Sequence, residues 1–335
     1  MRILLSRTDS IGDVVLTLPM AGVIKREFPG SEVHFLGKTY TREVVRCSTS
    51  VDHFYDWDEI KEGSDEEISA VFNSWNIDAW VHVFPDKRIS RIAKMAGIPV
   101  RIGTAGRSYH LLTCNRLVRF SRRRSRLHES QLNLKLLRGL KKNVMYSPND
   151  LAALSNFKNL PALNDELKPL LNAEKFKIIL HPKSKGSAVE WGLDNFSGLM
   201  GRLNGAEYQV IITGTAADNA LIGNQLPLDQ GNVLNLLGKL SLDQLIAVIS
   251  KSDCVVAAST GPLHLAGVTE RLAIGLFSSR RPIHPGRWSP IGPHATYLVY
   301  NEKCRRCRSG KTCDCISRIS PERVLRSIEG FRAVS

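Results

Sequence analysis

Two carboxylates lie close together near the start of the chain, in the segment SRTDSIGD at residues 6–13. The segment follows a predicted strand at Arg2–Leu5 and precedes a predicted helix, which is where doubly wound domains place their ligands. Gly12 would let the backbone turn tightly and approach a ligand. A carboxylate of Asp9 or Asp13 suits a general base, and the alternative is that one of them caps the helix. The turn contains neither G-x-G-x-x-G nor G-x-x-x-x-G-K-[ST], so it is not a phosphate loop.

Three loops in the second half of the chain, each directly after a predicted strand, suit a nucleotide. The first loop, at residues 180–187, carries Lys183, Ser184 and Lys185. Their charges and hydroxyl group suit a diphosphate. The alternative is an exposed loop with ordinary surface lysines.

The second loop, at residues 213–218, is a glycine-containing turn in which Thr215 and Asp218 could hold ribose hydroxyls. The alternative for Asp218 is an ordinary acid at the start of a helix, where the helix dipole favours negative charge.

The third loop, at residues 258–264, reads ASTGPLH. Ser259 or Thr260 can cap a helix that has a proline in its first turn. The free N–H groups of that helix, beginning at Gly261, could bind phosphate. His264 lies one turn further on, and the alternative is a structural histidine.

These loops need strands and helices that alternate, and both halves of the chain show this pattern. Strands joined by helices form parallel βαβ units, so we expect an α/β fold with two doubly wound domains and a ligand site in the cleft between them. A stretch rich in proline, asparagine and aspartate predicts the connection near residues 150–172. The predicted strands are Arg2–Leu5, Glu32–Leu36, His53–Tyr55, Ala79–Phe84, Lys177–Leu180, Tyr208–Thr213, Val233–Leu236, Cys254–Ala257 and Leu272–Phe277, and the predicted helices are Asp13–Phe28, Lys87–Ala96, Leu193–Leu203, Asp218–Gln225, Leu242–Ser250, Gly261–Gly267 and Ser320–Gly330.

Positive charge is concentrated in one window. The chain has 335 residues and a net charge of +14, and residues 86–142 hold 16 Lys and Arg against two acids. Such a block suggests an anionic partner: an acidic substrate, an anionic membrane or nucleic acid. Tyr109 and Phe120 are nearly the only aromatic residues in it, so base stacking is poor and we expect no nucleic acid. A solvated helix face is the alternative reading. The arginines with the strongest claim to an acceptor are Arg101, Arg107, Arg119 and the run Arg122–Arg124.

Other features bound the cellular setting. No run of 18 apolar residues exists, and Arg7, Asp9 and Asp13 interrupt any apolar stretch at the start, so we expect a cytoplasmic protein without a signal peptide.

Seven scattered cysteines argue against a disulfide framework. Four of them, Cys304, Cys307, Cys313 and Cys315, lie close enough to bind zinc, but the C-x-C step is short for a zinc site, and we expect free or redox-active thiols and no metal.

Taken together, these segments resemble glycosyltransferase family 9, the lipopolysaccharide heptosyltransferases. The matching segments are RTDSIGDVVLTLP at 7–19, HPKSKGSAVEW at 181–191, ITGTAAD at 212–218, LGKLSL at 237–242 and STGPLH at 259–264. The resemblance implies a GT-B fold and an inverting enzyme without a metal or other cofactor. It also implies an acceptor-binding domain at 1–155, a domain at 170–315 for a nucleotide-sugar, and a C-terminal helix in 316–335 that packs back on the first domain. We expect the nucleotide-sugar to be ADP-linked.

The resemblance also assigns roles to residues. Asp13 matches the general base, with Asp9 as a reserve base or as a neighbour that raises the pKa of Asp13. Two departures, Val189 in place of a basic residue and Ser259 in place of an acid, leave the donor sugar open, and Asp218 stands where the family usually has Glu. The donor-binding set is Lys183, Ser184, Lys185, Thr215, Asp218, Ser259, Thr260, Gly261 and His264, and the acceptor-binding set is Gly12, Arg101, Arg107, Arg119 and Arg122.

The implied acceptor is an anionic lipopolysaccharide, and the basic block would hold the enzyme peripherally at the anionic inner-membrane surface. Two alternatives stay open. One is a transferase with a donor other than heptose, and the other is a basic protein that binds glycan or nucleic acid without turnover.

Overall fold

The computed structural model describes residues 1–122, 125–171, 174–184, 186–311 and 313–334. Its contacts divide the chain into two units, Met1–Asn159 and Leu160–Ser335. The division falls within the connection that the sequence predicts at residues 150–172.

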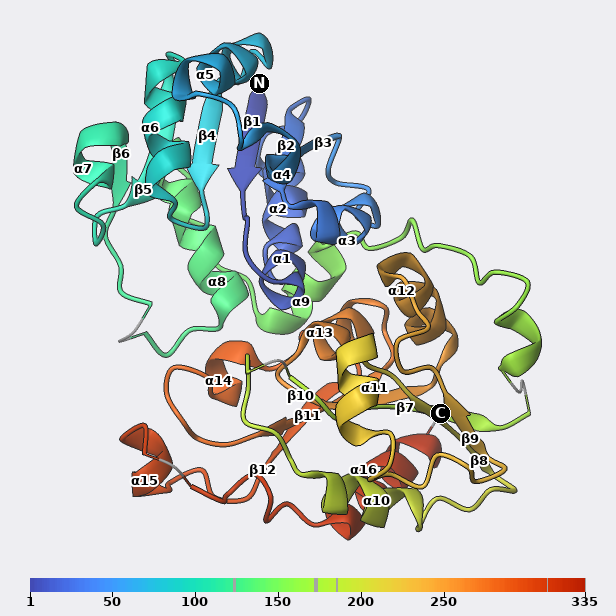
Figure 1. Cartoon of the computed structure of the whole chain (residues 1–335). Helices are drawn as coiled ribbons and strands as arrows, with labels where there is room; N and C mark the ends of the chain where they lie inside the picture. The colour runs from blue at the N-terminus through green and yellow to red at the C-terminus, as the bar shows by residue number, and fades with distance from the viewer. Residues whose placement is uncertain (123–124, 172–173, 185, 312, 335) are drawn as a thin grey trace. The chain divides into compact units, whose positions relative to one another are not determined.

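The first unit is built on six parallel strands in the order β3-β2-β1-β4-β5-β6 (Figure 1). This is the strand order of a doubly wound dinucleotide-type domain. The strands are β1 (Arg2–Ser6), β2 (Glu32–Gly37), β3 (His53–Asp56), β4 (Ala79–His82), β5 (Val100–Thr104) and β6 (Arg116–Val118).

Helices cover both faces of this sheet. On one face, Leu4, Leu36 and Trp80 of the strands form a core with apolar residues of α5 and α6. On the other face, α2 packs against β2, and the 3₁₀ helix η2 packs against β5 and β6. The helices are α1 (Ile11–Val15), α2 (Leu18–Glu27), η1 (Thr39–Thr41), α3 (Arg42–Arg46), α4 (Trp57–Ile60), α5 (Asp65–Ser74), α6 (Lys87–Met95), α7 (His110–Thr113), α8 (Glu129–Leu134), η2 (Lys135–Leu140) and α9 (Pro148–Leu154).

The helix predicted at Asp13–Phe28 is two helices, α1 and α2, so the prediction of a single helix is wrong. Thr17 is the N-cap of α2, and Pro19 lies in the first turn of that helix. A proline in a first turn loses no hydrogen bond, because the N–H groups there have no partner within the helix. Pro19 therefore begins a helix and does not kink one.

The second unit repeats the same topology. Its six parallel strands lie in the order β12-β11-β10-β7-β8-β9, which is the order of the first sheet once β7 is counted as its first strand. The strands are β7 (Phe176–His181), β8 (Tyr208–Ile212), β9 (Val233–Asn235), β10 (Cys254–Ala258), β11 (Leu272–Phe277) and β12 (Ala295–Val299), and the helices are η3 (Lys168–Leu170), α10 (Leu193–Met200), α11 (Ala216–Ile222), α12 (Leu242–Lys251), α13 (Gly261–Val268), α14 (Pro285–Trp288), α15 (Arg305–Arg308) and α16 (Pro321–Arg332).

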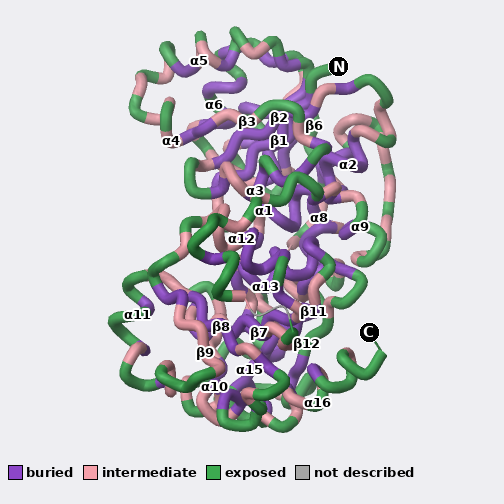
Figure 2. The backbone as a smooth tube through the Cα atoms, turned by 90° about the vertical axis from the view of Figure 1, so that its right-hand side faces the viewer, coloured by how far each residue is buried: buried purple, intermediate pink, exposed green. Residues whose placement is uncertain are grey.

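The central strands of both sheets are buried along most of their length, whereas the edge strands β3, β6, β9 and β12 are partly exposed (Figure 2). A parallel sheet covered on both faces needs such continuous apolar strands. The sequence does not predict three of the strands: β5, β6 and β12. β6 and β12 are edge strands with exposed residues, and β5 carries Arg101 as its second residue, so none of the three is a simple apolar run.

The C-terminal helix α16 packs against α10 and β11 in the second unit. Val324 and Ile328 on its inner face are fully buried in the core of that unit. Packing of this helix on the first domain stays a prediction.

With twelve residues, α16 is the longest helix in the described part of the chain. None of the described helices has the length and apolar character to cross a bilayer, for which about 20 residues are needed.

Candidate active site

Each sheet has one point where the strand order reverses, and ligands of doubly wound domains bind beyond the carboxyl ends of the strands at that point. In the first unit the point lies between β1 and β4, which pair up to Ser6↔His82. In the second unit it lies between β7 and β10, which pair up to Ala257↔His181. The acidic turn follows β1, and two of the three predicted nucleotide loops follow β7 and β10. The topology thus places the predicted residues where each sheet can bind a ligand.

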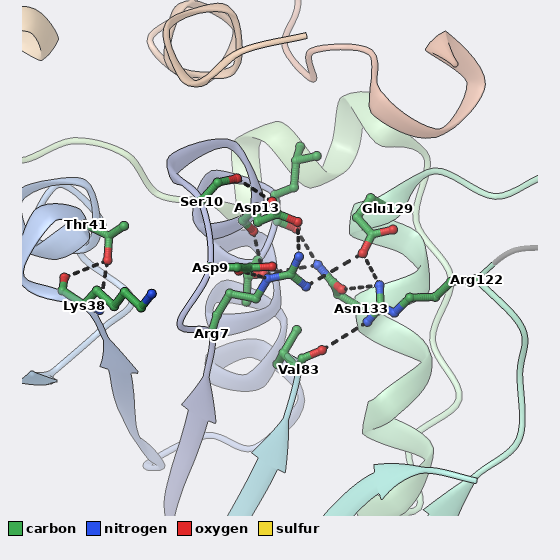
Figure 3. A network of polar contacts seen from close by, with 12 residues as sticks. Arg7, Asp9, Ser10, Asp13, Lys38, Thr41, Val83, Arg122, Glu129 and Asn133 are labelled. Carbon is green, nitrogen blue, oxygen red and sulfur yellow. Dashed lines mark hydrogen bonds and ion pairs between the residues drawn. The ribbon is translucent and has the colours of Figure 1, made fainter. Parts of the chain in front are cut away.

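A buried arginine organises the acidic turn (Figure 3). The side chain of Arg7 is only 4% exposed. Its Nε donates to Oδ1 of Asp9 at 2.6 Å, and its Nη2 donates to Oδ1 of Asp13. Its Nη1 lies 3.7 Å from Oε1 of Glu129. One guanidinium therefore holds three carboxylates around it, which fixes both candidate bases in place.

Burial and neighbouring charges shift the pKa values of Arg7 and Asp9. Burial alone would lower the pKa of Arg7, but attraction to Asp9, Asp13 and Glu129 outweighs burial, and the pKa is raised. Burial raises the pKa of Asp9 to about 6, with Asp13 acting in the same direction and Arg7 against it. A carboxyl group with this pKa exchanges protons close to neutral pH, which suits acid–base work.

Asp13 occupies the third position of α1, and its carboxylate accepts hydrogen bonds from Arg7 and from the hydroxyl of Ser10. The N-cap is Ser10, and its side chain makes no capping bond. The structure therefore does not support the alternative in which Asp9 or Asp13 is the cap residue. The predicted ligand-approach residue Gly12 is buried in the same helix.

The sequence analysis missed three residues of this network. Glu129 is 1% exposed and bonds to Arg122 as well as Arg7. Asn133 donates through Nδ2 to the carbonyl of Leu16 at 3.1 Å and thereby ties α8 to the C-terminal end of α1. Tyr40 donates its hydroxyl to the carbonyl of Asp9. A signal existed for Glu129 alone, since it is one of only two acids in the basic window.

Two of the predicted acceptor arginines serve the fold. Arg122 bonds to Glu129 and, at 3.0 Å, to Oδ1 of Asn133, so it belongs to the buried network and not to an open surface. The guanidinium of Arg101 donates to the backbone carbonyls of Ile98 and Thr113. Arg123 and Arg124 lie outside the described residues.

Arg107 and Arg119 are exposed, and Arg119 lines a groove of about 500 Å³. We call this the basic groove: Arg116, Arg119, Arg138 and Lys141, on β6, η2 and their flanking turns. All four side chains belong to exposed residues, and within the described part of the chain none of them pairs with an acid. The groove is therefore an unneutralised cationic surface.

In the second unit, the loop after β7 is internally bonded. Nζ of Lys183 lies 2.5 Å from Oε2 of Glu190, and the N–H of Ser184 donates to Oε1 of the same residue at 3.0 Å. The charge of Lys183 is thus already paired, which weakens its predicted role on a diphosphate. Lys185 lies outside the described residues.

Thr215 and Asp218 form a capping box at the start of α11. The hydroxyl of Thr215 donates to Oδ2 of Asp218 at 2.8 Å, and the N–H of Asp218 donates back to that hydroxyl at 3.3 Å. Asp218 is 5% exposed. The structure thus favours the alternative reading of Asp218 as a helix-start acid.

The loop after β10 presents a helix N-terminus. Thr260 is the N-cap of α13, yet its side chain makes no capping bond, and its buried Oγ1 has no partner among the described residues. Gly261 begins the helix, and His264 is buried within it. A buried hydroxyl without a partner costs roughly 1–3 kcal/mol, so a site that keeps one is a good candidate for binding a ligand.

A cavity of about 250 Å³ adjoins this loop. Most of the residues that line it are not predicted from the sequence. Ser259 and Val189 line it, as do Arg280 and Arg281, which follow β11. We call it the arginine cavity. Its other lining residues are Gly186, Ala188, Leu276, Phe277, Ser278, Pro282, Ile283, Gly310 and Ile316.

Comparison with known proteins identifies the family. The model of glycosyltransferase family 9 (heptosyltransferase) matches residues 88–316, more than half of the chain. The chain therefore belongs to glycosyltransferase family 9, as its motifs predict, and it has the GT-B fold.

The similar proteins agree with this assignment. A protein of Haemophilus influenzae, provisionally named a glycosyltransferase, is 25% identical over 316 residues, 89% of this chain and 88% of that protein. Lipopolysaccharide heptosyltransferase 2 of Salmonella typhimurium is 24% identical over 155 residues, 44% of this chain and 43% of that enzyme. The structure of ADP-heptose LPS heptosyltransferase II of E. coli shares the fold, with a TM-score of 0.77, 17% identity and full coverage of both chains.

Proposed function

We propose that this glycosyltransferase moves a heptose or a related sugar from a nucleoside-diphosphate sugar, ADP-linked by preference, to an anionic acceptor of the lipopolysaccharide type, with inversion at the anomeric carbon. The observation that carries the proposal is the Arg7-centred acidic network at the ligand-binding edge of the first sheet in a chain of family 9. It supplies a fixed carboxylate of the kind that inverting transfer requires.

The reaction is a single displacement. Asp13 takes the proton of an acceptor hydroxyl while that oxygen forms a bond to the anomeric carbon, and the bond from that carbon to the diphosphate oxygen breaks. Arg7 holds Asp13 in place and binds Asp9 through the same guanidinium. The proton ends on Asp13, and the nucleoside diphosphate leaves with the electron pair of the broken bond.

The second unit holds the donor in this proposal. The N–H groups at the start of α13, from Gly261, and the guanidinium groups of Arg280 and Arg281 face the charge that develops on the diphosphate. The hydroxyl of Thr260 gains a partner when the donor binds. These cationic and N–H groups can balance the charge of the leaving group, so the proposed chemistry uses no metal ion.

The basic groove binds the acceptor or the membrane that carries it. Its four cations suit the phosphates and carboxylates of an anionic glycolipid, and each is worth about 1 kcal/mol near an anionic bilayer. We accordingly propose that the enzyme works at the cytoplasmic surface of the inner membrane, held there peripherally.

A test is release of nucleoside diphosphate by the purified protein from ADP-heptose and from a panel of ADP-, UDP- and GDP-sugars, with and without a lipopolysaccharide-core acceptor. We expect release that depends on the acceptor, with ADP-heptose as the best donor, and a product of inverted configuration by NMR. Absence of both binding and release across the whole panel would overturn the proposal.

A second candidate function is transfer of a sugar other than heptose. Ser259 and Val189 favour it, since both line the arginine cavity at positions where the resemblance leads us to expect charged residues. The same panel decides between the two functions, because acceptor-dependent release from a single UDP- or GDP-sugar would replace ADP-heptose as the donor.

A further inference from the structure

We propose that Cys304, Cys307, Cys313 and Cys315 bind one thiophilic metal ion, zinc or iron, as a tetrahedral tetrathiolate, and that the ion fixes their loop against the arginine cavity. The site lies outside the proposed chemistry, which uses no metal. Its existence does not depend on the proposed function, and only its effect on the donor does.

The positions of the four sulfur atoms carry the proposal. All four lie within 4.8 Å of one another. Sγ of Cys313 is 3.6 Å from Sγ of Cys304 and 3.3 Å from Sγ of Cys315. A metal with four sulfur ligands at about 2.3 Å in a tetrahedron holds them about 3.8 Å apart. Four thiols thus already surround one point at nearly the spacing of a metal site.

The backbone explains how a C-x-C step completes this arrangement. Cys304 is the N-cap of the one-turn helix α15, and Cys307 is the third residue of that helix. The bond from the N–H of Arg308 to the carbonyl of Cys304 closes the turn. Positions three apart on a helix share a face. Gly310 then adopts φ +78°, a left-handed conformation that lets the chain turn back. The chain returns Cys313 and Cys315 to the same point.

This loop has no other core. Between Tyr300 and Asp314, Cys307 is the one described residue that is buried, and Cys304 and Cys313 are half-buried. Cys315, at 5% exposed, continues the cluster. Small segments that cannot bury apolar side chains are commonly held by a metal or by disulfides. Two disulfides would pair the four sulfurs separately, whereas here Cys313 contacts both Cys304 and Cys315.

The surrounding charge suits thiolates. A divalent ion with four thiolates carries a net charge of −2, which needs neighbouring cations. The loop supplies five exposed ones that have no ion-pair partner within the described part of the chain: Lys303, Arg305, Arg306, Arg308 and Lys311.

The cysteine loop forms part of the wall of the arginine cavity, so the ion would also affect that cavity. Gly310 and Ile316, which lie within and directly after the cluster, line the arginine cavity together with Arg281. Loss of the ion would loosen this wall. If the cavity binds the donor, as proposed above, metal loss raises the KM for the donor more than it lowers kcat.

The deciding experiment measures metal in the intact protein, purified without chelators or affinity resins that carry metal, by mass spectrometry of zinc and iron and by visible absorption. We expect close to one ion per chain. Thiolate-to-iron absorption identifies iron, and a colourless protein with one zinc identifies zinc. Cobalt substitution should then give the absorption of tetrahedral thiolate coordination.

Variants provide the controls. Cys307→Ser and Cys315→Ser should lose at least nine-tenths of the ion, whereas Cys114→Ala, at a buried thiol of the first unit, should keep it. Four findings would each overturn the proposal: less than about one-tenth of an ion per chain, disulfides among the four cysteines in the purified protein, an ion that the serine variants retain, or removal by brief dialysis against EDTA, which would indicate an adventitious ion only. The metal content of the wild-type protein tests the proposal even if a variant fails to fold. One bound ion per chain in a protein without transferase activity would support the metal site and count against the proposed function alone.

Discussion

The two sheets of the protein share one strand order, yet the loops at their reversal points differ in character. In the first unit, the buried guanidinium of Arg7 pairs with the carboxylates of Asp9, Asp13 and Glu129. In the second unit, the hydroxyl of Thr260 and the guanidinium groups of Arg280 and Arg281 in the arginine cavity have no such side-chain partners among the residues that the structure describes. The same topology thus carries a buried charged network in one unit and, in the other, a helix N-terminus beside a cavity lined by two arginines.

The difference fits the different tasks that the proposed reaction gives the two units. A carboxylate that must accept a proton in one geometry benefits from rigid partners. A site that must bind and release a charged leaving group benefits from groups that the ligand itself completes. Below, Arg7→Met and Asp9→Asn test whether the first unit depends on its internal bonds, and Thr260→Val tests whether the second depends on groups that a ligand completes.

The largest effect is expected for Arg7→Met. Removal of the guanidinium leaves Asp9, Asp13 and Glu129 close together, with only Glu129 still paired to a described cation, and breaking a buried ion pair costs about 3–5 kcal/mol. Urea unfolding of the variant should show this loss. Arg2→Met is the matched control, because its pair with Glu32 is exposed and worth less than about 1 kcal/mol. A loss below 1 kcal/mol in Arg7→Met would show that the network is not a structural unit.

Asp9→Asn should change the pH dependence of stability. The folded-state pKa of Asp9 is raised to about 6 from 3.8, so the folded state binds more protons than the unfolded state between these values. The contribution of Asp9 to stability is therefore fully present below about pH 4 and is lost as the pH rises through about 6. At pH 7.5 the variant should be more stable than the wild type by about 3 kcal/mol, and at pH 4 the two should differ by less than about 1 kcal/mol.

The measurement is urea unfolding at both pH values, with Asp165→Asn at an exposed position as the control. The Asp9→Asn variant should also transfer the sugar more slowly than the wild type, although it is more stable at pH 7.5, because Asp13 loses the neighbouring negative charge. A stability difference of equal size at both pH values would contradict the assigned pKa of Asp9.

Charge reversal in the basic groove should weaken membrane binding. Arg119→Glu with Arg138→Glu should lower binding to vesicles rich in anionic lipid by at least about tenfold at low salt, since each cation near the bilayer contributes about 1 kcal/mol. A pair of reversals at exposed lysines elsewhere, Lys158→Glu with Lys251→Glu, should have less effect. Equal losses in both pairs would indicate net charge alone and not a groove.

The smallest effect is expected at α13, which offers a matched pair of threonines. Thr260→Val removes a buried hydroxyl that has no partner among the described residues, so the free protein should not lose stability, while donor affinity should fall about fivefold. Thr269→Val removes a hydroxyl that donates to the carbonyl of Leu265 at 2.9 Å, so it should lose about 1 kcal/mol of stability and keep donor affinity. Thermal unfolding and calorimetric titration with the nucleoside diphosphate separate the two, and the reverse pattern would place the donor elsewhere.

Much of the fold follows from the sequence, since buried parallel strands such as β1, β7, β10 and β11 are nearly continuous apolar runs with a loop at each carboxyl end. The strands β5, β6 and β12 do not follow from it, because β6 and β12 include exposed residues and β5 and β6 carry arginine. Tertiary structure decides them, through pairing to an already formed neighbour.

The candidate site follows from the sequence only in part. The acidic turn and the loop at Thr260 can be found because they follow strong strands. Whether a charged side chain is free or paired cannot be found, because the partners are distant in sequence: Arg122 meets Glu129 and Asn133, and Lys183 meets Glu190. For the same reason Arg280 and Arg281 emerge as cavity residues only once β10 and β11 lie side by side.

The central claim is that the carboxylate of Asp13 removes the proton of the acceptor, and Asp13→Asn tests it most directly. Rates of acceptor-dependent release of nucleoside diphosphate should fall by about 10²–10⁴, the usual contribution of a general base, while calorimetric affinity for the nucleotide stays within about twofold of the wild type. A variant that keeps more than about a tenth of the wild-type rate, with intact fold and binding, would contradict the account and transfer the role of base to Asp9 or to another group.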